Sequence, residues 1–190
     1  KTAGENPFFT EWDTPHGGPP FDKIMPEHFM PAFERGMSLH EAEIDAITSN
    51  KDEATFENTI LAYDDAGQML AQTELVFGML CAAETNDRMQ ALQEQAMPLL
   101  AAHRDKIRLD DKLFVRVKEV YDRRAALGLD AEQMRLLQKT YDSFVRAGAL
   151  LDAEQKARLK EINGQLSLTA VKFGNNILAE NNNFVLELKS

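Results

Sequence analysis

The fold is decided near the end of the chain, where residues 128–159 read GLDAEQMRLLQKTYDSFVRAGALLDAEQKARL. Asp-Ala-Glu-Gln occurs twice, at 130–133 and at 152–155, each time shortly after a glycine. An Asp at the start of a helix accepts from the first-turn amides, and a Gln three residues later can reach back to the capping residue. Gly128 and Gly148 each provide a natural helix end. The stretch predicts one complete helix followed by the start of another. The sequence around the two tetrapeptides differs, so shared capping chemistry explains them better than an internal repeat.

Helical periodicity extends over most of the chain on either side of this stretch. Apolar side chains recur every three or four residues in six segments, the spacing of one helix face. Candidate first caps are Thr55, Asn86 and either Asp110 or Asp111, while Pro31 marks the first turn of the first long helix. We expect the segment after Thr55 to form one continuous helix, with Gly67 on its apolar stripe. The stripe of the sixth helix comprises Leu159, Ile162, Leu166, Ala170, Phe173 and Ile177.

The two ends of the chain depart from this pattern. Residues 1–25 form an irregular arm, because they are rich in Pro and Gly, and aromatic anchors are expected to strap it across the helices. These anchors are Phe8, Phe9, Trp12 and Phe21. Residues 184–190 alternate in the manner of a β-strand, and a lone strand needs a partner strand. We therefore expect an all-α fold, a bundle of about six helices over 26–183, with a terminal strand that belongs to a section downstream.

The composition restricts the class of partner. Lys and Arg number 21 against 31 Asp and Glu, a net charge of −10. Nucleic acid and anionic membranes both require concentrated positive charge, so neither is an expected partner. The one cysteine, Cys81, lies in an apolar helical run and is interpreted as a packed thiol. The sequence predicts a soluble protein and leaves its compartment open between cytoplasm and periplasm.

The residues most able to carry chemistry lack the spacing that chemistry needs. His40-Glu41 resembles the start of a zinc-protease helix, but Ile44 stands where the second histidine ligand would be. His40 and His103 fall on apolar stripes and are expected to be structural, whereas His16 and His28 are interpreted as surface residues. The acidic pairs 64–65 and 110–111 lack the spacing of a calcium loop. The sequence therefore predicts no catalytic, cofactor-binding or metal-binding residue in this chain.

Seven segments, read in order, together resemble the N-terminal region of the thimet-oligopeptidase-like zinc metallopeptidases. Two of them, Arg123-Arg124-Ala125-Ala126-Leu127-Gly128-Leu129-Asp130 and Phe144-Val145-Arg146-Ala147-Gly148-Ala149, look most like the peptidyl-dipeptidase branch. The other five are Asn6-Pro7-Phe8-Phe9, residues 21–33, Phe56-Glu57-Asn58-Thr59-Ile60, Thr85-Asn86-Asp87 and Lys172-Phe173-Gly174-Asn175-Asn176.

The resemblance implies a largely helical enzyme that holds zinc through a His-Glu-x-x-His helix and a later Glu, far downstream of the matched region. It implies that this chain forms one wall of a channel over the active site, that its partner is the C-terminal catalytic portion, and that the substrates are short peptides. No residue here matches a zinc ligand of the family. A second interpretation remains open: a stand-alone helical module that binds a partner helix. A His-Glu-x-x-His motif downstream in the gene would separate the two.

Overall fold

The structure is a computed structural model that describes residues 5–83 and 85–186. Within these ranges every regular element is helical, which confirms the predicted all-α class. Six long helices form the fold: α1 Phe29–Ser49, α3 Gln68–Ala83, α4 Asp87–Arg108, α5 Asp111–Asp122, α6 Ala131–Arg146 and α7 Ala153–Asn183. The short elements are η1 Pro7–Phe9, η2 Pro15–Gly17, η3 Pro26–His28, the π-helical turn η4 Phe56–Leu61, α2 Ala62–Asp64 and η5 Arg124–Ala126.

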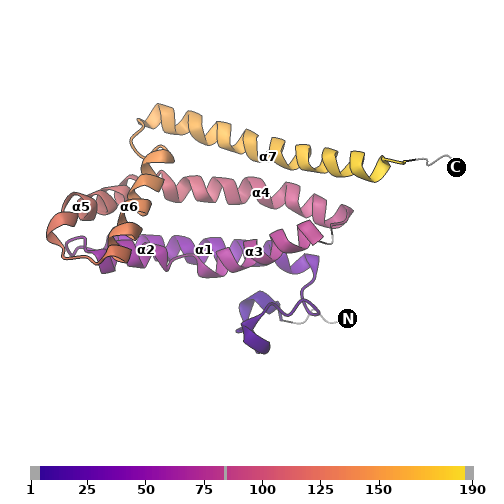
Figure 1. Ribbon diagram of the computed structural model, residues 1–190, viewed down its shortest axis with the longest axis horizontal. Helices are drawn as coiled ribbons and strands as arrows, with labels where there is room; N and C mark the ends of the chain where they lie inside the picture. Colours follow the sequence, from indigo (N-terminus) through magenta and orange to yellow (C-terminus); the bar gives the residue numbers. More distant parts are fainter. Residues whose placement is uncertain (1–4, 84, 187–190) are drawn as a thin grey trace.

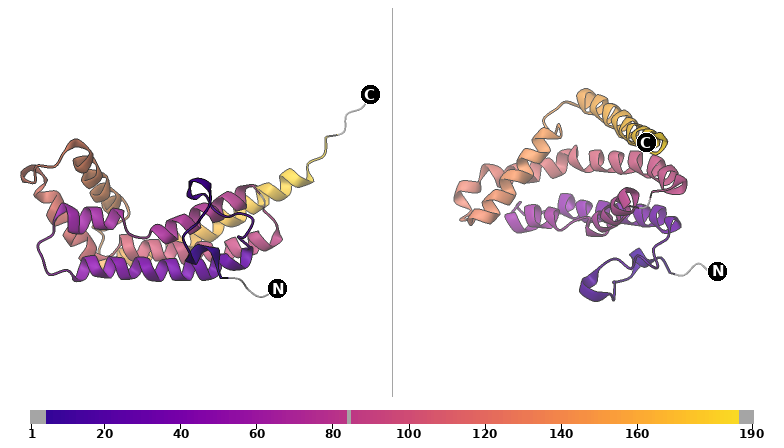
Figure 2. Two further views of the ribbon diagram at one scale, coloured as in Figure 1. Left: turned by 90° about the horizontal axis from the view of Figure 1, so that it is seen from below. Right: turned by 45° about the vertical axis from the view of Figure 1, so that its right-hand side comes forward.

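The molecule is elongated, because α1, α3, α4 and α7 run lengthwise (Figure 1). Helix α4 lies between α1 and α7, while α5 and α6 close one end of the molecule (Figures 1 and 2). Helix α7 packs along α4, three long helices earlier in the chain. The core has two apolar clusters. One, near α5 and α6, is built around Ile60, Leu113 and Phe144, and the other, near the arm, around Phe29, Phe33 and Phe77.

The helices begin where the capping residues predict. Asp130 accepts from the amides of residues 132 and 133, and the side chain of Gln133 accepts from the Asp130 amide at 3.1 Å. Asp152 and Gln155 repeat this reciprocal arrangement at the start of α7. These bonds satisfy first-turn donors that have no partner inside the helix. Capping bonds also confirm Thr55, Asn86 and Asp110.

The N-terminal arm is held by aromatic side chains, as predicted for three of the four anchors. Phe8 is buried against Phe29, with ring centroids 5.3 Å apart, and Trp12 meets Phe8 edge-on at 6.1 Å. Phe9 lies beneath the guanidinium of Arg35, 4.5 Å from its ring centroid, a cation–π contact. These contacts fix η1 against α1.

Phe21 does not act as an anchor, and that part of the prediction is wrong. Its side chain is 45% exposed, whereas Ile24, three residues further on, is buried. Alternation of apolar and polar residues is absent from this turn-rich segment, so the sequence gives no register from which to tell the inward side chain from the outward one.

The expected continuous helix after Thr55 is also broken, and the break lies at Gly67. This residue has a φ of 77°, a left-handed conformation that glycine adopts without the clash a Cβ would cause. Helix α3 starts immediately afterwards. The carboxylate of Glu43 on α1 accepts a 2.7 Å hydrogen bond from the Gly67 amide, which holds the turn against α1. The apolar spacing continues across the turn, so periodicity alone did not reveal it.

Helices α1 and α3 approach each other closely at two glycines. The position of a Cβ on Gly36 would lie 3.0 Å from the Cα of Leu70, and one on Gly67 would lie 2.9 Å from the ring of His40. Gly36 of α1 therefore faces the backbone of Leu70 on α3, and Gly67, in the turn before α3, faces the ring of His40 on α1. Any added methyl group must push the helices apart or displace the His40 ring.

A buried cation ties the segment between α1 and η4 to α5. The guanidinium of Arg116 donates to the carbonyls of Asn50 and Asp52, each at 3.1 Å, and to the side chain of Asn58 at 3.0 Å. Arg116 is buried, so these acceptors replace the water that its charge loses.

The expected terminal strand lies partly outside the described residues, which end at 186. Residues 184–186 lie beyond the end of α7, and their side chains are exposed.

Replacing Gly67 by Ala should destabilise the protein by about 1–3 kcal/mol, because alanine is strained at positive φ and its methyl would meet His40. The matched control is Gly78→Ala, inside α3 with nothing within 4 Å of the new methyl. That change should stabilise the helix by about 0.5–1 kcal/mol. Urea unfolding followed by circular dichroism measures both, and changes of the same sign would contradict this account of the turn.

Candidate functional site

Of the four histidines, the structure brings His40 and His103 together. His103 on α4 is buried, and its Nε2 lies 3.0 Å from Nδ1 of His40 on α1, so one imidazole donates a hydrogen bond to the other. His16 is exposed, and Nδ1 of His28 accepts from the amide of Met25 at 3.0 Å. His28 thus helps to cap the turn before α1.

The histidine pair is bordered by an ion pair. Nδ1 of His103 lies 3.5 Å from one carboxylate oxygen of Glu41, and Nζ of Lys106 lies 2.8 Å from the other. The hydrogen bond from Lys106 lowers the pKa of Glu41 and keeps this carboxyl ionised. Glu41 and Lys106 are both partly exposed, so this ion pair lies between the two histidines and solvent.

Burial lowers the pKa of both histidines, since the charged imidazolium loses its hydration. At His40 the nearby His103 lowers the pKa further, whereas the carboxylates of Glu41 and Glu43 oppose the shift. At His103 the carboxylates of Glu41 and Glu74 oppose the effect of burial, and Lys106 adds to it. Both rings are therefore held neutral, the state that allows one to donate and the other to accept.

Zinc does not fit this pair, although two imidazole nitrogens 3.0 Å apart could face one ion. A zinc site requires at least three protein ligands. In the part of the chain that the structure describes, no group of three or more His, Cys, Asp or Glu side chains could hold a metal. Ile44, at the position where a protease helix would carry its second histidine, is buried in the core.

The remaining polar candidates have structural surroundings. Asp110 caps α5, and Asp111 pairs with Lys156 of α7. Burial raises the pKa of the half-buried Cys81 thiol, the opposite of what a nucleophilic thiolate needs. Asp64 and Asp65 are exposed at the turn before α3. The geometry supplies no nucleophile paired with a base among these residues.

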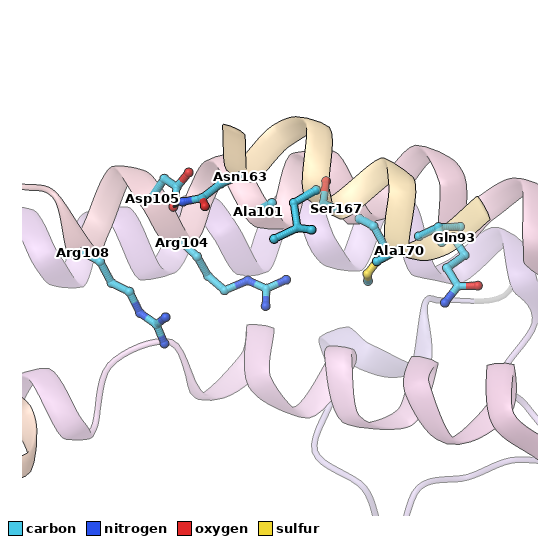
Figure 3. Close-up of a pocket in the computed structure, with 11 residues that line it drawn as sticks. Gln93, Ala101, Arg104, Asp105, Arg108, Asn163, Ser167 and Ala170 are labelled. Atoms are coloured by element: carbon cyan, nitrogen blue, oxygen red, sulfur yellow. Dashed lines mark hydrogen bonds between the residues drawn. The ribbon is translucent and has the colours of Figure 1, made fainter. Parts of the chain in front are cut away.

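A groove runs between α4 and α7, with a volume of about 530 Å³. Asn163 of α7 donates to Asp105 of α4 at 2.8 Å and closes one side of it. Arg104 and Arg108 extend from α4 in a common direction, away from Asp105 and Asn163 (Figure 3). Its lining residues are Gln93, Met97, Ala101, Arg104, Asp105, Arg108, Asn163, Leu166, Ser167, Ala170 and Val171. Sequence reasoning missed this groove, because its two walls are far apart in the chain.

The apolar stripe of α7 is largely uncovered. Leu166 is 62% and Phe173 65% exposed, although both were expected to face a core. Helix α7 instead packs on α4 through the adjacent positions Asn163, Ser167 and Val171, so the stripe lies at the edge of this contact. Large exposed apolar faces mark interaction surfaces in proteins.

None of the helices in the described ranges combines the length and apolar character that crossing a membrane requires.

Comparison with known proteins identifies a class of peptidases. Over 93% of its length the chain is 41% identical to dipeptidyl carboxypeptidase of Escherichia coli, and over 92% it is 38% identical to that of Salmonella typhimurium. It is 23% identical to oligopeptidase A of E. coli over 87% of its length. The chain spans about a quarter of the length of these relatives, 24–26%. No family model matches it.

These similarities confirm the resemblance to the thimet-oligopeptidase-like peptidases. The chain is all-α in the residues that the structure describes, and the relatives that it resembles are peptidases several times longer than the chain. The two dipeptidyl carboxypeptidases match at higher identity than oligopeptidase A, in agreement with the branch that the sequence motifs indicated.

The histidine pair predicts a specific pH dependence of stability. Both folded-state pKa values are lowered from 6.5, so the unfolded chain binds more protons as the pH falls below that value. Stability contributed by the neutral pair should be complete above pH 6.5 and decline as the pH falls toward the folded-state pKa values.

Urea unfolding between pH 7.5 and 5.5 tests this. The double variant His40→Asn/His103→Asn should have a lower free energy of unfolding at pH 7.5 and a weaker pH dependence. His16→Asn, at an exposed histidine, should leave the pH profile unchanged. A double variant with the full pH dependence of the original chain would show that the pair does not cause it.

Proposed function

We propose that this chain is the N-terminal portion of a zinc-dependent peptidyl-dipeptidase that removes C-terminal dipeptides from short peptides. The identity of 41% with E. coli dipeptidyl carboxypeptidase, over 93% of the chain, carries the proposal. The helices form one wall of the channel that leads to the active site, and they restrict entry to short, unstructured peptides. The catalytic residues and the zinc belong to the remainder of the enzyme.

The arrangement of α7 supports a partner within the same protein. Its uncovered stripe is aligned along one helix: Leu166 borders the groove beside α4, and Phe173 and Ile177 are exposed further along, where a second section can bury them. Covering apolar side chains of this size stabilises association by about 25 cal/mol for each Å² removed from water. In this proposal, residues 1–25 are the arm, 26–183 the helical domain, and 184–190 the start of a strand that pairs with the catalytic portion.

If catalysis and zinc binding belong to the remainder of the enzyme, the isolated chain should show neither. The chain alone should cleave no peptide and retain no stoichiometric zinc after dialysis, whereas the full-length enzyme should lose activity with a zinc chelator. About one tightly held zinc ion per isolated chain would contradict the assignment of the metal to the remainder. Metal analysis and a dipeptide-release assay on the same preparation provide the two readouts.

The double variant Leu166→Glu/Phe173→Glu tests the role of α7. Mixing the chain with the separately produced remainder should restore dipeptide release, and the variant should weaken this association at least about tenfold, because it buries unpaired charge. Leu75→Glu is the matched control, since Leu75 is exposed to 65% on α3, away from the stripe. Two folded portions that fail to associate would favour the stand-alone module.

A further inference from the structure

A concentration of positive charge lies where α4 and α6 meet. The groove between α4 and α7 shares Arg108 with a second depression of about 520 Å³ against α6. We call the two together the basic groove. Its cationic side chains are Arg104, Arg108, Arg135, Lys139 and Arg146.

The charge of the basic groove is not balanced by neighbouring carboxylates. In the ranges that the structure describes, none of the five cations lies within 4 Å of an Asp or Glu oxygen, although seven other ion pairs occur there. The two carboxylates of the groove are bound to amides instead: Asp105 accepts from Asn163 at 2.8 Å, and Asp142 accepts from Gln138 at 2.9 Å. Five cations and two anions leave a local charge of +3 in a chain of −10.

Local helix stability does not account for this arrangement. Arg108 and Arg146 lie in the last turns of α4 and α6, where cations complement the helix dipole. Arg135 and Lys139 lie in the first half and middle of α6, without that benefit. They are also four residues apart, a spacing at which like charges repel on one helix face. An anion bound between α4 and α6 would relieve that repulsion.

We propose that the basic groove binds the carboxylates of short acidic peptides. The proposal rests on the proposed function in taking a peptide as the ligand. Guanidinium groups present paired donors that match the two oxygens of a carboxylate. Leu166, Ala170 and Val171 provide an apolar wall beside Arg104, so an apolar side chain of the same peptide can pack there. The two depressions, of about 530 and 520 Å³, fall within the ~300–1,000 Å³ typical of small-ligand sites.

A peptide fits the lining better than a nucleic acid does. Single-stranded nucleic acids bind through aromatic side chains on which bases stack, together with a positive groove. Taken together, the described residues that line the two depressions include Gln, Ser, Met, Leu and Ala but no aromatic residue. The groove thus recognises charge and a small apolar contact. In the full enzyme it would favour acidic peptides at the channel wall.

Binding to the isolated chain tests the proposal without any cleavage reaction. The probe is a blocked tetrapeptide with two glutamates, compared with its counterpart carrying two glutamines, by calorimetry at about 20 mM salt. The acidic peptide should bind at least tenfold more tightly, and its affinity should fall as salt rises. The double variant Arg135→Gln/Arg146→Gln should reduce its affinity at least tenfold. The matched control Lys160→Gln/Lys172→Gln removes the same charge from exposed positions of α7 outside the lining and should change affinity less than twofold.

Equal affinity for the two peptides, or an equal loss in both double variants, would overturn the proposal. A blocked single glutamate that competes as well as the tetrapeptide at the same concentration would overturn a peptide as the ligand, and so would tighter binding of a short single-stranded oligonucleotide. The peptide comparison uses the unaltered chain, so it does not depend on the folding of any variant. A failure here leaves association with the catalytic portion untouched, and a failure of that association leaves peptide binding untouched.

Discussion

The close approach of α1 and α3 is the constraint on which the rest of the structure depends. Gly36 on α1 accommodates Leu70 of α3, and Gly67, in the turn just before α3, accommodates the ring of His40 on α1. This approach places His40 where it can bond with His103, which links α1 to α4. Helix α4 in turn carries α7 along its length. Two glycines thus set the spacing of α1 and α3, because packed interiors do not absorb an extra methyl group without strain.

Much of this fold could be predicted from local chemistry. The capping boxes at Asp130 and Asp152 act within four residues, so the sequence contains both partners of each bond. The turn at Gly67 was missed because its cause, contact with His40 and Glu43, comes from a different helix. The uncovered stripe of α7 was misread for a related reason: periodicity identifies an apolar face but does not identify what covers it.

The candidate sites illustrate the same limit for charge. A net charge of −10 describes the chain as a whole and conceals a groove of +3, since its cations come from α4 and α6, about 30 residues or more apart. The burial of Arg116 could not be predicted from the sequence either, because its three hydrogen-bond acceptors lie more than 50 positions away in the chain. Histidine pairing could have been suspected from two histidines on apolar stripes, but only the packing of α1 on α4 determines that they meet.

The end of helix α7 also bears on how readily proteases can cut the chain. At 31 residues it extends about 46 Å. Its last turns contain three consecutive asparagines with low helix propensity, and their side chains are exposed. Such an end opens readily, and segments that open are the ones that proteases cut. In the proposed enzyme, contact between α7 and the catalytic portion would shield this end from proteases.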